Sequence, residues 1–506
     1  MSIRELLGTT SLVLGTVILF KLFWGGFGVA QPDGSFVAAT TIASHAPLQL
    51  EVDFIDKEQK IEDAPVHVKT DYADMTFSSA GGTISDLTFI RKLDHKTQTF
   101  HVWNSKNAVD REQQPFLVAL EDETPYYYKL VSQQDNEDSV QVVYESKTSA
   151  ATIKKIFTVD KHLHKIDFEL TIKPQKLIQP RLVWPSPYLQ ALEEEDTVTA
   201  NVIASNNKFK QIAAGSVNFS QGFVNPTLFG TADKYFAFIM VKDAHNFAQR
   251  AYYKSVDKCL LSFLEAKPIE QETTWNVSFY FGAKEPSAMG LVDSRLDKIL
   301  NYGLFSFVSK LVLKLLHIIE TYTHNYGWAI IIVTILIRLL LLPFNINGEK
   351  SRKKFEANQK QQEYISQKYK HDPEKLEQAR IEHMQKHGMG GMLGCALPVL
   401  LQMPFFWGLM GALNNSIQLY RAPFIFWIKD LSLPDPYYVL PLIAFIGFVG
   451  SALMGPGKKD MKNLFPQLAV SLVFGSFMAT MSAGVTLYFA TTFLLQFGQT
   501  QLQKAL

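Results

Sequence analysis

Cysteine is scarce in this sequence of 506 residues, which contains only Cys259 and Cys395. The first lies in a polar stretch and the second at the start of an apolar one, so we expect no disulfide between them, and no residue spacing fits a metal site. Net charge is also nearly absent, because 49 Lys and Arg stand against 48 Asp and Glu. Without excess basic charge to neutralise phosphates, the chain is not expected to bind nucleic acid directly.

The sequence also lacks the motifs of energy-coupled machines. It contains no GxxxxGK[ST] phosphate-binding loop, so nucleotide-driven work and a bound cofactor are not expected. The long apolar segments carry no paired acidic residues for a proton relay. No repeat of two halves is apparent. These absences weaken the case for a pump or an ion-coupled carrier.

Apolar residues make up 47% of the chain but are distributed unevenly. They concentrate near the N-terminus and beyond residue 326, whereas the middle of the chain is polar and strand-like. This distribution predicts one sizeable exported domain joined to a membrane domain.

Residues 1–28 form the first apolar segment, and 29–60 a polar linker. The apolar run is longer than the core of a usual signal peptide, which favours a retained transmembrane anchor over a cleaved signal. With either interpretation, the residues that follow are exported.

Residues 61–290 show the alternation of short strands, as in FTVDKHLHKIDFELTIK at 157–173, and predict a β-sandwich. His162 and His164 flank a hairpin turn, but no further ligand lies near them in sequence, so a metal site is not expected. The acidic run at 193–196 is interpreted as a solvated loop. No nucleophile motif or convergent carboxylate pair stands out, so we expect a scaffold or docking domain and no enzyme, which also argues against an anchored carbohydrate-active enzyme.

Residues 291–322 have apolar positions at helical spacing and predict an amphipathic helix lying in the outer membrane interface. A buried helix of the exported domain is the alternative interpretation.

The segment 326–344, YGWAIIIVTILIRLLLLPF, is long and apolar enough to span a membrane, with Pro343 marking its end. A single charge, Arg338, interrupts it, and Thr334 lies one turn earlier on the same face. A guanidinium inside a membrane usually faces protein or a water-filled cavity. Snorkelling of Arg338 to the nearby interface is the alternative.

The stretch 348–388 has more basic than acidic residues and predicts a cytoplasmic helical hairpin. Asp372 can cap its second helix, and Pro373 suits the first helical position. The hairpin, with Lys353 and Lys354 among its basic residues, is a candidate docking cap. A solvated spacer or a lipid head-group contact remains open.

Four further spans are predicted, and the basic segments all fall on one side if both termini are cytoplasmic. They lie at about 393–413, 437–454, 464–481 and 483–502.

Several spans carry polar stripes. Gln402 lies between Pro398 and Pro404 in the third span, and the fifth carries Gln467, Ser471 and Gly475. Tyr488, Thr492 and Gln496 recur every four residues in the sixth. Helix packing alone could account for small and hydroxyl residues. An arginine together with several polar stripes instead favours a hydrated cavity within the membrane.

Four segments carry a family resemblance. In order and spacing, they resemble the YidC-type membrane protein insertases of bacterial inner membranes, strongly over about 295–500. The segments are GWAIIIVTILIRLLLLP, LGCALPVLLQMPFFWGL, APFIFWIKDLSLPDPYYVLP and SAGVTLYF.

The resemblance implies a polytopic α-helical membrane protein, with a five-helix core over 323–506, an N-terminal anchor and an inserted periplasmic β-sandwich. It implies a hydrophilic groove, with Arg338 at its centre and Thr334, Gln402, Tyr488 and Thr492 along it. The implied clients are nascent inner-membrane proteins, received alone or beside the Sec translocon, in contact with membrane lipids and with ribosome–nascent chain complexes.

The chain departs from the family pattern at three places. Phe489 stands where a second tyrosine is common, and Ser482 replaces a frequent proline. The tail QTQLQKAL has Lys504 as its only basic residue, which makes tail-mediated ribosome binding doubtful. The competing hypothesis from the residues is a transporter or channel with Arg338 as an anion site.

Overall fold

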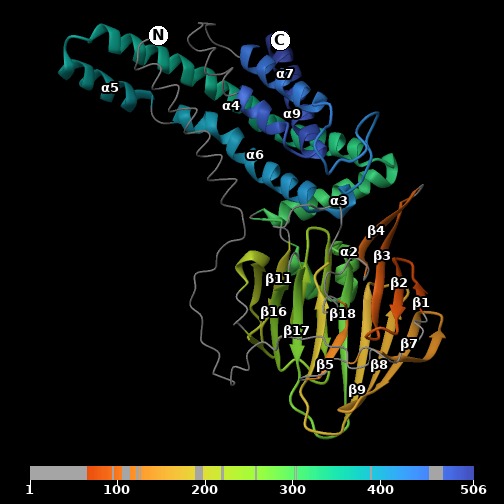
Figure 1. Ribbon diagram of the computed structural model, residues 1–506. Helices are drawn as coiled ribbons and strands as arrows, with labels where there is room; N and C mark the ends of the chain where they lie inside the picture. Colours follow the sequence, from red (N-terminus) through yellow and green to blue (C-terminus); the bar gives the residue numbers. More distant parts are fainter. Residues whose placement is uncertain are drawn as a thin grey trace. The chain divides into compact units, whose positions relative to one another are not determined.

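The computed structural model is shown in Figure 1. The anchor predicted at 1–28 and the linker at 29–60 lie outside the described residues. The structure describes residues 65–93, 96–104, 114–120, 125, 127–187, 198–217, 222–256, 259–300, 302–303, 305–387, 390–454 and 471–505.

The chain divides into two compact units, with the boundary between Leu300 and Asn301. The first described unit is almost entirely β-structure and the second is helical. Each is described by itself.

A large antiparallel sheet of nine strands forms one layer of the β unit (Figure 1). Every neighbouring pair in it is antiparallel. Its order is β12 (Phe209–Ala213), β11 (Thr199–Ile203), β14 (Leu228–Ala232), β15 (Phe236–Asp243), β18 (Thr273–Ala283), β9 (Lys165–Pro174), β8 (Ala151–Asp160), β7 (Ser139–Lys147) and β6 (Lys129–Asp135).

Two smaller antiparallel sheets complete the unit. One has the order β13 (Phe223–Val224), β16 (Arg250–Val256), β17 (Cys259–Glu265), β10 (Pro180–Pro185) and β5 (Leu117–Leu120). The other has the order β1 (Val66–Lys69), β2 (Ala73–Ser78), β3 (Thr83–Leu93) and β4 (Lys96–Asn104).

Aromatic rings on one face of the nine-stranded sheet form the core. Burial alternates along β8 and β9, because successive side chains of a strand point to opposite faces. Phe157 of β8 packs against Phe77 of β2 with ring centroids 5.1 Å apart, and Phe279 of β18 against Trp184 of β10 at 5.1 Å. Both smaller sheets therefore pack on this face, which confirms the predicted β-sandwich.

One lysine lies within this aromatic core. Lys155 of β8 is fully buried, and its Nζ donates to Gly81 O at 2.7 Å and to Phe116 O at 2.8 Å. The ammonium group also lies 4.5 Å from the centre of the Tyr128 ring. Burial lowers the pKa of Lys155 well below its ordinary value. The side chain thus connects three segments that are distant in sequence.

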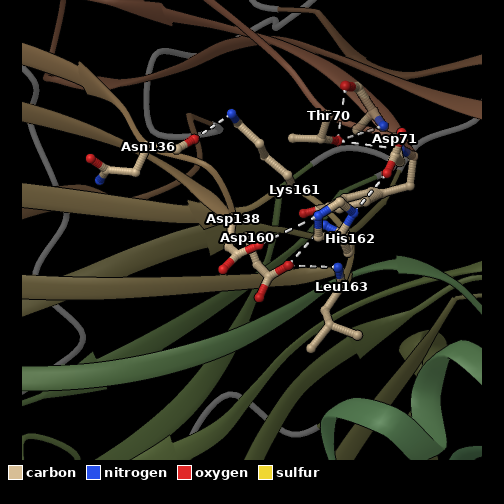
Figure 2. Close-up of polar contacts among 10 residues, drawn as sticks. Thr70, Asp71, Asn136, Asp138, Asp160, Lys161, His162 and Leu163 are labelled. Atoms are coloured by element: carbon tan, nitrogen blue, oxygen red, sulfur yellow. Dashed lines mark hydrogen bonds and ion pairs between the residues drawn. The ribbon is translucent and has the colours of Figure 1, made fainter.

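The turn between β8 and β9 carries two histidines with opposite environments. His162 is exposed, and its ring nitrogens lie 2.8 Å from Asp71 Oδ2 and 3.8 Å from Asp138 Oδ1. Figure 2 shows these contacts, with Asp160 accepting from the backbone of the same turn. His162 thus links three turns at one end of the unit through its contacts with Asp71 and Asp138.

His164 is enclosed by aromatic rings, with centroids 4.2 Å from Tyr72 and 5.8 Å from Tyr280. Burial lowers the pKa of His164 from 6.5 to about 4. Between these two values the unfolded chain binds a proton that the folded chain does not, so stability falls as the pH drops from 6.5 to 4. The loss should approach about 3 kcal/mol, since one pKa unit is worth about 1.4 kcal/mol.

This pH dependence can be measured by urea unfolding of the full chain in nanodiscs, followed by the emission of buried tryptophans. We expect His164→Gln to have a flatter stability profile than the parent chain between pH 6.5 and 4. Equal slopes for His164→Gln and the parent chain would contradict the assignment.

The helix expected over 291–322 is wrong in its extent. The short helix α2 (Pro286–Val292) and the 3-10 turn η5 (Ser294–Ile299) belong to the β unit, where Leu296 and Ile299 are buried. Arg295 fixes this segment by donating to Thr227 O at 3.0 Å, a partner distant in sequence. Of the predicted segment, only α3 (Ser306–Thr323) belongs to the helical unit. The helix therefore begins at Ser306 and not at 291, where the helical spacing of apolar residues begins.

The helical unit contains α4 (Tyr326–Lys368), α5 (Pro373–His387), α6 (Gly390–Asn415), α7 (Val439–Met454) and α9 (Ala483–Ala505). Helix α4 packs against α3, α6 and α9, and α9 packs against α7. Residues 471–478 are also helical, whereas 464–470 of the predicted fifth span lie outside the described residues.

Pro343, which marks the end of the predicted apolar span, lies inside a longer helix. Helix α4 continues through it to Lys368. Proline has no backbone N–H, so it removes one hydrogen bond and disturbs one turn of the helix. The hydrogen bonds of the turns on both sides keep the long helix α4 continuous.

Among the described residues, one stretch, Tyr326–Ile346, is long and apolar enough to cross a membrane, and Val439–Gly450 is a shorter apolar helix. Only 28% of the most apolar window of Tyr326–Ile346 is buried, unlike the core helix of a soluble protein.

Candidate functional site

Arg338 joins α4 to α9. Its Nη2 donates to Gln496 Oε1 over 3.4 Å, a long hydrogen bond to an uncharged partner. The side chain is half-buried, and its Nε has no hydrogen-bond partner among the described residues. The guanidinium therefore has donor capacity that the protein does not use.

The apolar parts of the helices around this charge offer no acidic side chain to neutralise it. Residues 326–346, 390–415, 439–454 and 483–505 contain no Asp or Glu. An unneutralised guanidinium favours anionic groups and water as its partners. The site therefore presents positive charge at the junction of these helices.

Tyr488 brings a third helix to the site. Its hydroxyl lies close to the side chains of Gln402 of α6 and of Thr492, one turn further along α9, and also near Arg338. Tyr488 and Thr492 are both 3% exposed, whereas Gln402 is half-buried. The Thr492 hydroxyl makes no hydrogen bond of standard geometry in the described structure. We call Arg338, Gln402, Tyr488, Thr492 and Gln496 the polar cluster.

Thr334 is fully buried, and its hydroxyl donates to Ile330 O of the same helix at 2.6 Å. Its hydrogen bond is therefore satisfied within α4, as is common for threonine in helices. The side chain borders the polar cluster in sequence, but the structure places its hydroxyl in the interior of the unit.

The departure at Phe489 has a local explanation. Its ring lies 5.3 Å from Phe406 and 5.4 Å from Phe474, and is stacked on Phe493 at 5.9 Å. This position belongs to an aromatic cluster, where ring packing takes the place of the hydroxyl that the family often carries.

Gln496 was predicted as part of the polar stripe with Tyr488 and Thr492, but it was not among the groove residues that the resemblance implies. The hydrogen bond to Arg338 adds it to the polar cluster. The stripe of the fifth span is described only in part: Gln467 lies outside the described residues, and Gly475 packs against Phe445 of α7.

Helices α4 and α5 form the helical hairpin that the sequence predicts (Figure 1). Asp372 accepts from Lys375 N at 3.3 Å, and Pro373 is the first residue of α5. Arg380 donates to Ser366 Oγ at 3.0 Å and connects the two helices. Lys353 and Lys354 lie in α4, but their side chains are outside the described part of the chain.

Two family models match this chain. One describes a 60Kd inner membrane protein and matches residues 318–505, and the other describes the YidC periplasmic domain and matches residues 65–315. Together they cover most of the chain. The two descriptions are those of an inner-membrane protein and of a periplasmic domain, and this chain matches both in succession.

Curated relatives carry the name membrane protein insertase YidC. The protein from Geotalea daltonii is 31% identical over 297 residues, which cover 58% of this chain and 55% of that protein. The protein from Helicobacter pylori is 28% identical over 381 residues, which cover 74% of this chain and 67% of that protein. The chain thus spans between about half and two thirds of the length of these relatives.

Among solved structures, one described as an active YidC insertase with its first transmembrane domain resolved aligns with 87% of this chain and 94% of its own. The sequence identity is 16% and the TM-score is 0.38. Taken together, the two family models and the named relatives show that the chain belongs to the YidC-type family of membrane protein insertases.

Proposed function

We propose that this protein inserts and folds inner-membrane proteins by way of a hydrophilic groove lined by the polar cluster. The observation that carries the proposal is Arg338, a half-buried guanidinium with one long hydrogen bond to Gln496. The apolar parts of α4, α6, α7 and α9 contain no acidic side chain. Gln496 is exposed, so the cluster is open to a substrate on that side.

The mechanism follows from the cost of moving polar groups through hydrocarbon. Each unsatisfied polar group costs several kcal/mol in an apolar medium. A wet groove that reaches part of the way across the membrane shortens this barrier. Arg338 attracts acidic residues of the translocated tail by charge-assisted hydrogen bonds. The apolar segment of the client then partitions into lipid, and its burial drives insertion.

The proposed topology places both termini and the hairpin of α4 and α5 in the cytoplasm, with the β unit in the periplasm. The basic residues of the hairpin, Lys353 and Lys354 among them, support this orientation. The hairpin, whose cap is formed by Asp372 and Pro373, would receive nascent chains from the ribosome. We further propose that the protein works alone or beside the Sec translocon, and that the surrounding lipids take up the client.

Photocrosslinking tests this proposal directly. A photoreactive residue at position 402, 488 or 496 should crosslink to a ribosome-held membrane protein with a short acidic tail. The matched control is Leu340, which is 62% exposed on α4. Because it lies two residues from Arg338, it points to a different side of the helix. Crosslinks of equal strength from Leu340 and from the polar cluster would contradict a groove.

The transporter hypothesis is not favoured by the comparisons, because the relatives are named insertases. Purified protein in liposomes should show no saturable flux of small anions that depends on Arg338. Such a flux, together with the absence of crosslinks from the polar cluster, would show that Arg338 is an anion site of a transporter.

A further inference from the structure

The segment between α6 and α7 exposes an unusual amount of aromatic surface. Within residues 420–438, which we call the aromatic loop, Phe426 is 87% exposed, Tyr437 69%, Tyr438 59% and Leu433 56%. The Trp427 ring lies 6.0 Å from that of Phe426 and 6.4 Å from that of Tyr437. Contiguous apolar surface of this kind marks an interaction site.

Two carboxylates hold the aromatic loop in shape. Asp435 is 2% exposed and accepts from Trp427 Nε1 at 2.9 Å and from Leu440 N at 2.7 Å. Asp430 accepts from Arg421 N at 3.1 Å and from Ser432 Oγ at 2.7 Å. These two carboxylates are thus used within the loop, whereas the rings of Phe426, Tyr437 and Tyr438 are exposed.

Phe426 and Tyr438 adopt the left-handed backbone conformation, with φ of 49° and 55°. This conformation is unfavourable for large residues and persists only where the surrounding structure enforces it. The outward display of these two rings is therefore imposed by the fold of the loop.

The aromatic loop lies where three apolar helices begin. Asn325, the residue before α4, donates to Phe424 O at 2.9 Å, and Trp328 packs edge-on against the Phe424 ring at 5.7 Å. Tyr438 directly precedes α7. The first residue of α9, Ala483, donates its N–H to Leu433 O at 2.7 Å. The loop therefore shares the level at which the membrane-length stretch of α4 starts.

We propose that the aromatic loop is a lipid-binding surface, which inserts into the boundary between head groups and acyl chains on the membrane face where α4 begins. Phe426 and Leu433 contact acyl chains, and Tyr437 and Tyr438 direct their hydroxyls to the head groups, as tyrosine does at membrane interfaces. Lys429, which is also exposed, is placed to meet lipid phosphates. The loop thereby fixes the depth of the helical unit in the bilayer.

Three features on this surface favour lipid as the occupant. The patch continues without a break into the ends of membrane-length and apolar helices. Its residue types are those of the membrane interface, aromatic with an exposed lysine. The carboxylates of Asp430 and Asp435 accept from backbone N–H groups of the loop itself, so they are not offered to a protein partner.

Spin labels measure this depth in the full chain. Both native cysteines are replaced by alanine, and a label is attached to a new cysteine at Phe426, Leu433 or Tyr437 in vesicles of phosphatidylethanolamine and phosphatidylglycerol. Collisions with oxygen and with a water-soluble nickel chelate then report depth. The labels should lie about 5–10 Å below the head-group level, the depth that interfacial apolar side chains reach.

The matched control is Val131, which is 53% exposed on β6 of the β unit and should report water. Labels in the aromatic loop that are as accessible to the nickel chelate as the label at 131 would overturn the proposal. Labels shielded from both reagents would also overturn it, because they would show a covering protein surface. Leu433 provides a position without the left-handed backbone of Phe426, so a folding defect of one variant leaves the test intact.

Discussion

Replacing Arg338 with alanine is expected to lower the insertion of a client with an acidic translocated tail about 10- to 100-fold. The guanidinium is half-buried and has only the Gln496 amide as a hydrogen-bond partner among the described residues. A carboxylate of the client can therefore form charge-assisted hydrogen bonds, which are worth about 1.5–3 kcal/mol each. The measurement is the initial rate of insertion into proteoliposomes, by protease protection of the tail.

Matched variants separate this role from a structural one. Arg338→Lys keeps the charge and should recover part of the rate, although it loses the planar guanidinium geometry. Leu339→Ala changes an exposed neighbour on the same helix and should leave insertion unchanged. A client with a neutral tail should respond to Arg338→Ala far less than one with an acidic tail. Equal losses for both tails would show that Arg338 acts through folding alone.

The polar cluster could be predicted from the sequence because each of its helices carries a polar stripe. Gln402, Tyr488 and Arg338 come from three different helices, and the structure places them together. The stripes do not determine which side chains or carbonyls these polar groups choose as hydrogen-bond partners. The Thr334 hydroxyl bonds to Ile330 O on its own helix, while Gln496 receives the hydrogen bond from Arg338. Such choices depend on rotamers and helix rotation, which periodicity does not determine.

The β-sandwich was predictable from alternation, but its sheet order was not. Strand β18 pairs with β9 and β15, which precede it by very different distances along the chain. Lys155 illustrates the same limit. It occupies a core-facing position of β8, and the carbonyls of Gly81 and Phe116 that accept from it come from distant segments. A sequence pattern marks Lys155 as misplaced, and only the tertiary structure supplies its partners.

The segment boundaries were the least predictable feature. Helical periodicity continues from 291 to 322, yet the structure assigns its first residues to the β unit, because Leu296 and Ile299 are buried there. Pro343 marks the end of the predicted apolar span, yet the helix itself continues to Lys368. Tertiary packing, which a local pattern does not contain, therefore decides where such elements begin and end.

Gly230→Ala should destabilise the β unit by about 4 kcal/mol or more, the range of severe core disruption. A Cβ at this position would lie 2.3 Å from Phe238 O and 2.8 Å from Ile239 Cα, and both are backbone atoms. Strand β15 cannot retreat, because it also pairs with β18 in the middle of the nine-stranded sheet. The backbone φ of +154° at Gly230 adds further strain for any side chain.

The control for this variant is Gly290→Ala in α2, where a new Cβ would meet no atom within 4 Å. Alanine is favoured over glycine in a helix by about 1 kcal/mol, so this variant should be as stable as the parent chain or slightly more stable. The measurement is the urea midpoint of the tryptophan transition in nanodiscs. Equal midpoints for the two alanine variants would show that β14 and β15 can separate without cost. The packing of this sheet on Tyr253, whose hydroxyl donates to Gly230 O at 2.8 Å, would then not limit stability. A large difference would locate the stability of the β unit in the contact between these central strands.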